Sequence, residues 1–131
     1  MSDLIYDQFQ NTVQDVLIRH VSILDIITKL EESNSRINRA TVKTITSCGC
    51  LNLHAEKPEI PEDAEYKDIK AYADNQLRGE LCSVCREKID QEIGTHLFYL
   101  AALCNHLNIN LYDAFLHEYN QIKTLGPFSL Y

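Results

Sequence analysis

The residues whose chemistry is easiest to read from this sequence are four of its five cysteines, which form two close pairs. The first pair is Cys48-x-Cys50 and the second is Cys82-x-x-Cys85. Zn²⁺ binds four thiolates in a tetrahedron at about 2.3 Å, and two pairs from separate segments supply such a set. Residues three apart share one face of a helix, which favours the second pair at a helix start. The sequence therefore predicts a structural zinc site made by Cys48, Cys50, Cys82 and Cys85.

Two other uses of these thiols remain open from the sequence. A thiol near a helix N-terminus has a lowered pKa, so Cys82 and Cys85 are also typical of a redox dithiol. A buried thiol that binds nothing serves as a small hydrophobic side chain, and we expect this of Cys104, which lies on an apolar helix face. The segment between the pairs, residues 51–81, is longer than in common zinc ribbons, so the spacing alone is not diagnostic.

The cysteines must be positioned by segments that have mainly helical periodicity. Apolar residues recur at steps of three and four over residues 13–30, with a break expected at 33–35 and a further helical stretch to about 45. Residues 64–77 and 80–106 also predict helices, and Asn110 is placed to cap a last helix over 111–123. No segment predicts a strand. We expect an all-α bundle of four to five helices, one domain over residues 1–131, with a cysteine lobe at 46–85 between its core helix segments.

Charge and hydropathy exclude several classes of function. The net charge of −7 argues against a general nucleic-acid binder, which needs excess lysine and arginine. No stretch approaches the roughly 18 apolar residues that cross a bilayer, and the acidic N-terminus lacks the features of a signal peptide. We therefore expect a cytoplasmic protein with no membrane contact, where cysteine pairs bind metal rather than form disulfides. The long helices are apolar on more than one side, which predicts a homodimer.

Two parts of the chain resemble a known family. They are residues 92–103, which read EIGTHLFYLAAL and are followed by LNINL at 107–111, and residues 29–32, which read KLEE. They resemble the MazG-like branch of the all-α nucleoside triphosphate pyrophosphohydrolases. The resemblance implies a nucleotide ligand, a MazG-like bundle and assembly as a dimer.

In that family, acidic side chains spaced ExxE and ExxD on two helices hold Mg²⁺, and a nucleoside triphosphate is cleaved to a monophosphate and pyrophosphate. The resemblance places Glu32 and Glu92 at the first acid of each pair, as magnesium ligands. Ser35 and Thr95 stand where the second acids are expected. His96 lies on the same helix face as Glu92 and would shift the preference toward a transition metal.

The sequence leaves two functions open. Arg36, Arg39 and Lys43 share a helix face and are candidate phosphate contacts, although such stripes, and acids like Glu32 and Glu92, are also typical of solvated helix faces. Loss of the second acids favours a degenerate pyrophosphohydrolase that binds nucleotide or acts as an interaction or sensor module, stabilised by structural zinc. The alternative is an active magnesium-dependent pyrophosphohydrolase.

Overall fold

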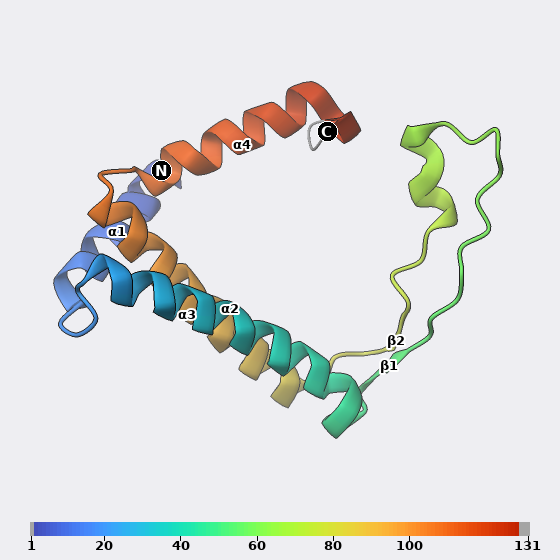
Figure 1. The fold of residues 1–131 in the computed structure, drawn as a ribbon, viewed down its shortest axis with the longest axis horizontal. Coiled ribbons are helices and arrows are strands. Elements are labelled where there is room, and N and C mark those ends of the chain that lie inside the picture. The colour runs from blue at the N-terminus through green and yellow to red at the C-terminus, as the bar shows by residue number, and fades with distance from the viewer. Residues whose placement is uncertain (1, 129–131) are drawn as a thin grey trace. The chain divides into compact units, whose positions relative to one another are not determined.

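The fold is mostly α-helical with one small β-hairpin (Figure 1), in a computed structural model that describes residues 2–128. The chain divides into two compact units, one made of the residues up to Ile37 and from Asp90 onward, the other of Asn38–Ile89. The elements in chain order are the α-helices α1 (Ser2–Val16) and α2 (Ile23–Lys43), a π-helical turn η1 (Thr44–Cys48), strand β1 (Leu51–Leu53), a 3-10 helix η2 (Tyr66–Tyr72), strand β2 (Leu77–Gly79), the α-helices α3 (Ser83–His106) and α4 (Leu111–Leu125), and a final 3-10 turn η3 (Gly126–Phe128).

The first unit is built around a small apolar core. Val13 of α1, Ile26 of α2, and Ala101 and Ala102 of α3 are buried together. The two alanines let neighbouring helices approach α3 closely, because their side chains take little space. Five partly buried hydrophobic residues pack against this core: Phe9, Leu17, Phe98, Leu103 and Leu111.

A hydrogen-bonded amide network joins α1 to the end of α3. The Gln10 side-chain nitrogen donates to Asn105 Oδ1 and to the carbonyl of Ile109, both at 3.0 Å. The Gln10 side-chain oxygen accepts the backbone N–H of Leu111 at 2.7 Å, and Asn105 Nδ2 donates to the Gln10 carbonyl at 2.9 Å. Every polar group of the buried Gln10 side chain therefore has a partner, so its desolvation is compensated.

The predicted cap of the last helix is confirmed. Asn110 accepts the backbone N–H of Asp113 through Oδ1 at 3.0 Å, which satisfies one of the free donors at the start of α4. The Asn110 side-chain nitrogen also donates to Asp7 of α1 at 3.0 Å, so the cap ties the two helices together.

The expected helix break at residues 33–35 is wrong. α2 runs through these residues without interruption, because the Ser33 hydroxyl donates to the Leu30 carbonyl of its own helix at 2.7 Å. The break lies earlier, between Val16 and Ile23. There His20 has a left-handed φ of 57°, and the Ser22 hydroxyl accepts the N–H of Leu24 at 3.2 Å.

The expectation of an all-α fold is wrong for the second unit, which contains an antiparallel hairpin. β1 pairs with β2 in the register Leu51↔Gly79, Asn52↔Arg78 and Leu53↔Leu77 (Figure 1). The helix expected over 64–77 is only the short 3-10 helix η2, at the far end of the loop that joins the strands. Strands of three residues are too short to show an alternating pattern in the sequence.

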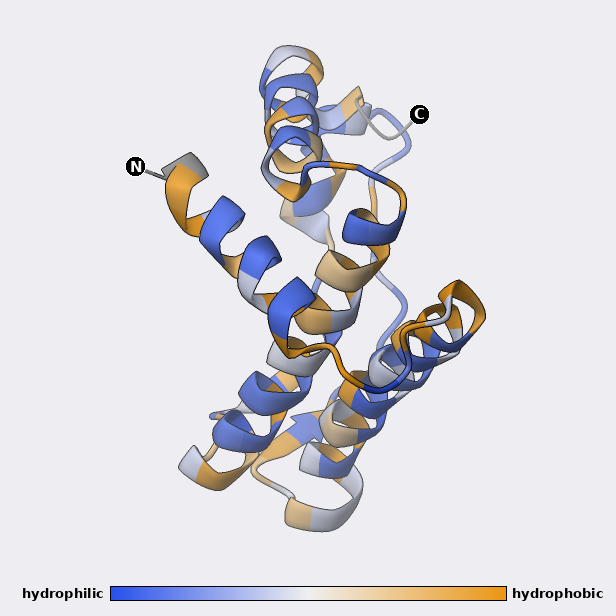
Figure 2. Cartoon of the chain, turned by 90° about the vertical axis from the view of Figure 1, so that its left-hand side faces the viewer, coloured by the Kyte–Doolittle hydropathy of each residue, from blue (hydrophilic) through white to orange (hydrophobic). Residues whose placement is uncertain are grey.

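Apolar and polar residues alternate along the helices of the chain (Figure 2). None of the helices in the described part of the chain has the length and apolar character needed to span a bilayer.

Candidate metal centre

Four thiols meet at the base of the hairpin in the second unit. Cys48 ends η1, Cys50 immediately precedes β1, Cys82 immediately precedes α3, and Cys85 lies in the first turn of α3. Their sulfur atoms all lie within 4.8 Å of one another. Within residues 2–128, they form the one group of three or more histidine, cysteine or acidic side chains close enough to share a metal ion. The structure thus brings together the four cysteines that the sequence singled out.

The spacing of the sulfur atoms fits a tetrahedral ion. The Cys48 and Cys82 sulfurs are 3.8 Å apart. A tetrahedron with metal–sulfur bonds of about 2.3 Å has edges of about 3.8 Å, so these atoms already lie at the separation that a Zn²⁺ ion requires. All four are free thiols, as is the buried Cys104, and the chemistry of a four-thiol set favours zinc or iron. Cys104 lies in the other unit, outside this group.

Local backbone geometry explains why the first pair can face the second. Gly49 adopts a left-handed φ of 79°, and its N–H donates to the Thr44 carbonyl at 2.8 Å, which closes the π turn before Cys50. Gly79 has a φ of 95°, and a Cβ at this position would overlap with the carbonyl oxygen of Cys50. The close approach of the two strands next to the thiols therefore requires glycine at position 79.

The thiols affect one another's protonation. The backbone N–H of Cys85 donates to the Cys82 sulfur at 3.4 Å, and this bond, with the neighbouring thiols, lowers the pKa of Cys82 to about 7. The thiol hydrogen bond with Cys82 raises the pKa of Cys85 to about 12. At pH 7 without metal, Cys82 is therefore about half in its thiolate form, and a metal ion must displace the remaining thiol protons of the cluster.

The second unit has little to stabilise it besides this cluster. Among residues 38–89, all of which the structure describes, Thr44 is the only buried residue. In the part of the chain that the structure describes, every buried hydrophobic residue lies in the first unit. A unit without an apolar core requires another source of folding free energy, and a bound metal ion supplies it in many small domains.

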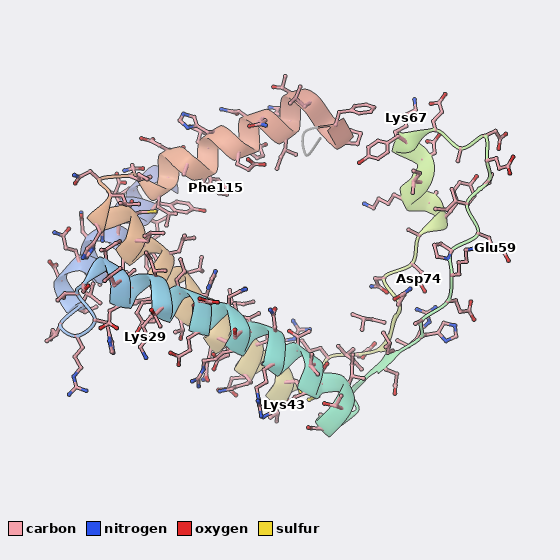
Figure 3. All side chains as sticks on the ribbon, in the orientation of Figure 1. Lys29, Lys43, Glu59, Lys67, Asp74 and Phe115 are labelled. Atoms are coloured by element: carbon pink, nitrogen blue, oxygen red, sulfur yellow. The ribbon has the colours of Figure 1, made fainter. Side chains whose placement is uncertain are left out.

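A second group of polar side chains lies between α2 and α3 in the first unit. It lines a cavity of about 240 Å³ and contains the candidate magnesium ligands Glu32 and Glu92. The other lining residues are Lys29, which Figure 3 labels on α2, and Ser33, Arg36, Thr95 and Tyr99.

Cations accompany both carboxylates of this cavity. Arg36 Nε donates to the buried Glu92 at 3.0 Å, and another nitrogen of its guanidinium lies 3.8 Å from Glu32. Lys29 Nζ donates to Glu32 at 3.2 Å. The guanidinium of Arg36 therefore bridges the two acids that the sequence assigned to magnesium.

The other candidate site residues, His96, Arg39 and Lys43, do not line this cavity. His96 lies beside Ser33, with Nδ1 at 2.8 Å from its hydroxyl. Because that hydroxyl donates to the Leu30 carbonyl, the hydrogen-bond network assigns the proton to His96 Nδ1. The structure does not bring Glu32, Glu92 and His96 within reach of one ion. Arg39 and Lys43 are exposed on the part of α2 that belongs to the second unit.

Sequence reasoning missed Lys29 and Ser33 as members of this group. Their spacing carried a signal, because Glu32 and Ser33 lie three and four residues after Lys29, and Arg36 lies four and three residues after them, so all four share a helix face. No protein-family model, curated protein or solved structure matches this chain.

We predict that Cys82→Ser weakens metal binding, so that the purified protein holds less metal, and lowers its melting temperature by roughly 5–15 °C, because only three thiols remain to cross-link the second unit. Metal content by mass spectrometry and a calorimetric melt measure both effects. Cys104→Ala, outside the cluster, is the control and keeps its full metal content. An unchanged melt and metal content in Cys82→Ser would contradict the metal centre.

We also predict that Arg36→Ala lowers the free energy of unfolding by about 1–2 kcal/mol, since it leaves the buried Glu92 without its arginine. The estimate is below the usual cost of breaking a buried pair because Arg36 is itself half exposed. Arg39→Ala, an exposed arginine on the same helix, is the matched control in urea denaturation. Equal stability of the two variants would show that the Arg36–Glu92 pair contributes nothing.

Proposed function

We propose that this protein is a zinc-stabilised helical module that binds a nucleotide on a MazG-like scaffold without hydrolysing it. The observation that carries the zinc part is the group of four thiols whose sulfurs lie within 4.8 Å of one another. The near-absence of buried residues elsewhere in residues 38–89 supports it, because the metal then supplies the stability that a core would otherwise provide.

The arrangement of Arg36 supports binding without hydrolysis. A magnesium site that activates water needs several carboxylate oxygens free to coordinate the ion. Here the guanidinium of Arg36 lies against Glu92 and Glu32, and Lys29 neutralises Glu32 further. Thr95, which stands at the position of a missing acid, donates its hydroxyl to the Gln91 carbonyl of its own helix at 3.2 Å. The cavity thus holds two cations for two acids, and an added Mg²⁺ would have to displace Arg36.

The same cavity has groups that suit a nucleotide. Lys29 and Arg36 line this cavity and offer positive charge for a phosphate. Tyr99 adds an aromatic ring at the cavity wall that can stack on a base. A phosphate would compete with the two glutamates for Arg36, so we expect binding to be weakened by salt.

An active magnesium-dependent pyrophosphohydrolase is the second candidate, and one observation favours it. Glu32 and Glu92, from different helices, line the same cavity, as a metal cage between two helices requires. In this case the Arg36 bridge would open when the metal and substrate enter.

The two candidates differ in pyrophosphate release. We predict that the zinc-loaded protein releases no pyrophosphate from a panel of natural and modified nucleoside triphosphates with Mg²⁺ or Mn²⁺. Calorimetry should nevertheless detect nucleotide binding when a magnesium chelator is present. Arg36→Gln should reduce that binding by roughly tenfold, because it removes a charge-assisted contact.

Turnover that disappears in Glu92→Gln would establish the enzyme instead. Loss of nucleotide binding in every condition, from folded protein, would contradict the nucleotide part of the proposal and leave the zinc part standing.

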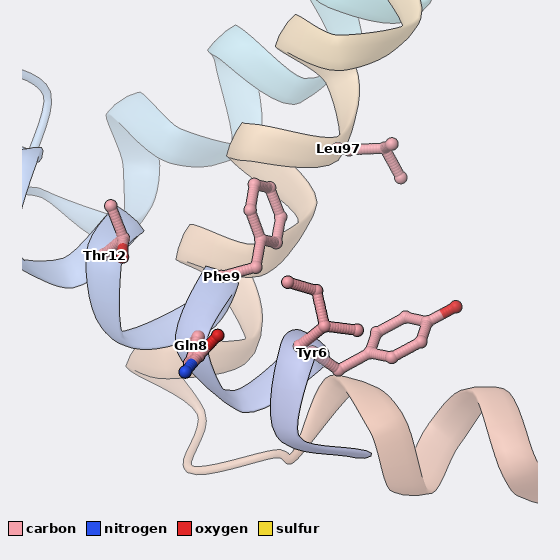
Figure 4. A pocket seen from close by; sticks show the side chains of 6 residues that line it. Tyr6, Gln8, Phe9, Thr12 and Leu97 are labelled. Atoms are coloured by element: carbon pink, nitrogen blue, oxygen red, sulfur yellow. The ribbon is translucent and has the colours of Figure 1, made fainter. Parts of the chain in front are cut away.

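We further propose that the first unit pairs with a second copy of itself. An apolar groove is lined by Ile5, Tyr6, Gln8, Phe9, Thr12 and Leu97, from α1 and α3 (Figure 4). In α4 no residue is buried, and Phe115, Tyr119, Ile122 and Leu125 form a stripe along it that is about half exposed. Phe115 contacts Tyr6 of α1 in the same copy, with ring centroids 5.3 Å apart, and the rest of the stripe remains about half exposed and open to a partner.

A second copy of the chain would cover the groove and the α4 stripe in the same contact. In a twofold dimer, the α4 stripe of each copy can meet the groove of the other, so both apolar surfaces are covered by the same contact. Ile5 of the groove and the four residues of the stripe are each about half exposed or more, so a contact between copies would bury apolar surface on both sides.

We predict that Ile122→Glu converts the protein to a monomer at micromolar concentration, because it places a charge in the centre of that interface. Light scattering after size-exclusion chromatography measures the mass. Ile18→Glu, at an exposed position in the loop before α2, is the control and stays dimeric. A wild-type protein that is monomeric at high concentration would contradict the pairing.

A further inference from the structure

Cys48 differs from the other thiols of the metal centre in its exposure. It is exposed, whereas Cys50, Cys82 and Cys85 are half-buried. A peroxide oxidises thiolates that it can reach, and cysteines that bind a metal ion are held as thiolates. Cys48 is therefore the sulfur of this group that a dissolved peroxide meets first.

A resolving thiol lies next to Cys48. The Cys82 sulfur is 3.8 Å away, and the two residues come from different segments, the end of η1 and the start of α3. An oxidised cysteine condenses readily with a thiol that is already in contact with it. A bond between these sulfurs would join the same two segments that the metal ion joins.

We propose that Cys48 is a peroxide-oxidised modification site whose disulfide with Cys82 releases the metal ion. This inference rests on the zinc site proposed above and adds its regulation. The chemical class of the oxidant is a hydroperoxide, with hydrogen peroxide as the simplest member.

The reaction balances with one peroxide for each disulfide. The Cys48 thiolate attacks a peroxide oxygen, the O–O bond breaks, and Cys48 becomes a sulfenic acid while hydroxide leaves. The Cys82 thiolate then attacks the Cys48 sulfur, the S–S bond forms, and a second hydroxide leaves. Both hydroxides take protons to become water, so the peroxide gains the two electrons that the cysteines lose. Only Cys50 and Cys85 then remain as thiol ligands, too few to keep the ion.

The disulfide also replaces the metal as a cross-link. The residues between Cys48 and Cys82 include the hairpin, η2 and the loops that join them, and they stay closed by the S–S bond. A covalent link between these segments limits the freedom of the unfolded chain, as the metal does. The oxidised protein should therefore release its zinc while the second unit remains folded.

The test uses the zinc-loaded protein treated with hydrogen peroxide, with a chromophoric zinc indicator and peptide mapping by mass spectrometry. We expect release of the bound zinc together with a Cys48–Cys82 disulfide, and recovery of zinc binding after treatment with dithiothreitol and added zinc. The oxidised, metal-free protein should melt at a higher temperature than the reduced, metal-free protein.

Two variants separate this reaction from general oxidation. Cys104→Ala should release zinc at the wild-type rate. In Cys48→Ser, which holds zinc through three thiols, the peroxide-dependent part of the release, measured against the same variant without peroxide, should be at least about tenfold smaller. Zinc that stays bound while peroxide oxidises Cys104, or a disulfide between Cys82 and Cys85 instead, would overturn the inference. A protein that holds no zinc before peroxide is added would overturn the proposed zinc function, and its disulfide map would still decide whether Cys48 pairs with Cys82.

Discussion

The second unit depends on one constraint, the convergence of two chain segments on four thiols. Residues 38–89 contain a single buried residue, so packing alone gives this unit little cohesion. The hairpin contributes three residue pairs, and Gly79 lets the strands approach beside Cys50. A tetrahedral ion that binds all four sulfurs would convert this weak contact into a cross-link, and folding of the unit and binding of the metal would then be one equilibrium.

The first unit is stabilised both by buried apolar side chains and by hydrogen bonds that satisfy its buried polar side chains. Its core is small, yet the polar side chains buried beside it have partners: Gln10 bonds to the end of α3, Ser33 to its own helix and to His96, and Glu92 to Arg36. The Arg36 bridge neutralises a pair of carboxylates that would otherwise repel each other across the two helices. The same bridge engages both carboxylates, so a cation added to this cavity would have to displace Arg36.

Parts of this architecture could be predicted from the sequence because their signals are local. The CxC and CxxC pairs, the helix expected over residues 80–106 and the cap at Asn110 each depend on residues that are close together in the chain. The hairpin could not be predicted, since its strands pair across a long loop. The need for glycine at position 79 also becomes visible only when the Cys50 carbonyl oxygen is placed beside it. The uninterrupted α2 was missed because the Ser33 hydroxyl bonds within the helix rather than breaking it. The Arg36 bridge was missed because it joins two helices far apart in the chain.

The most direct test of the central claim is the visible and near-ultraviolet spectrum of the protein when Co²⁺ is added in place of Zn²⁺. Four thiolates around a tetrahedral Co²⁺ give intense sulfur-to-metal charge-transfer bands and strong long-wavelength d–d bands, which disappear when zinc is then added. We predict this spectrum at one cobalt per chain, with weaker charge transfer when any one of Cys48, Cys50, Cys82 or Cys85 is replaced by serine. A weak spectrum typical of six oxygen ligands, or one unaffected by these substitutions, would contradict the account.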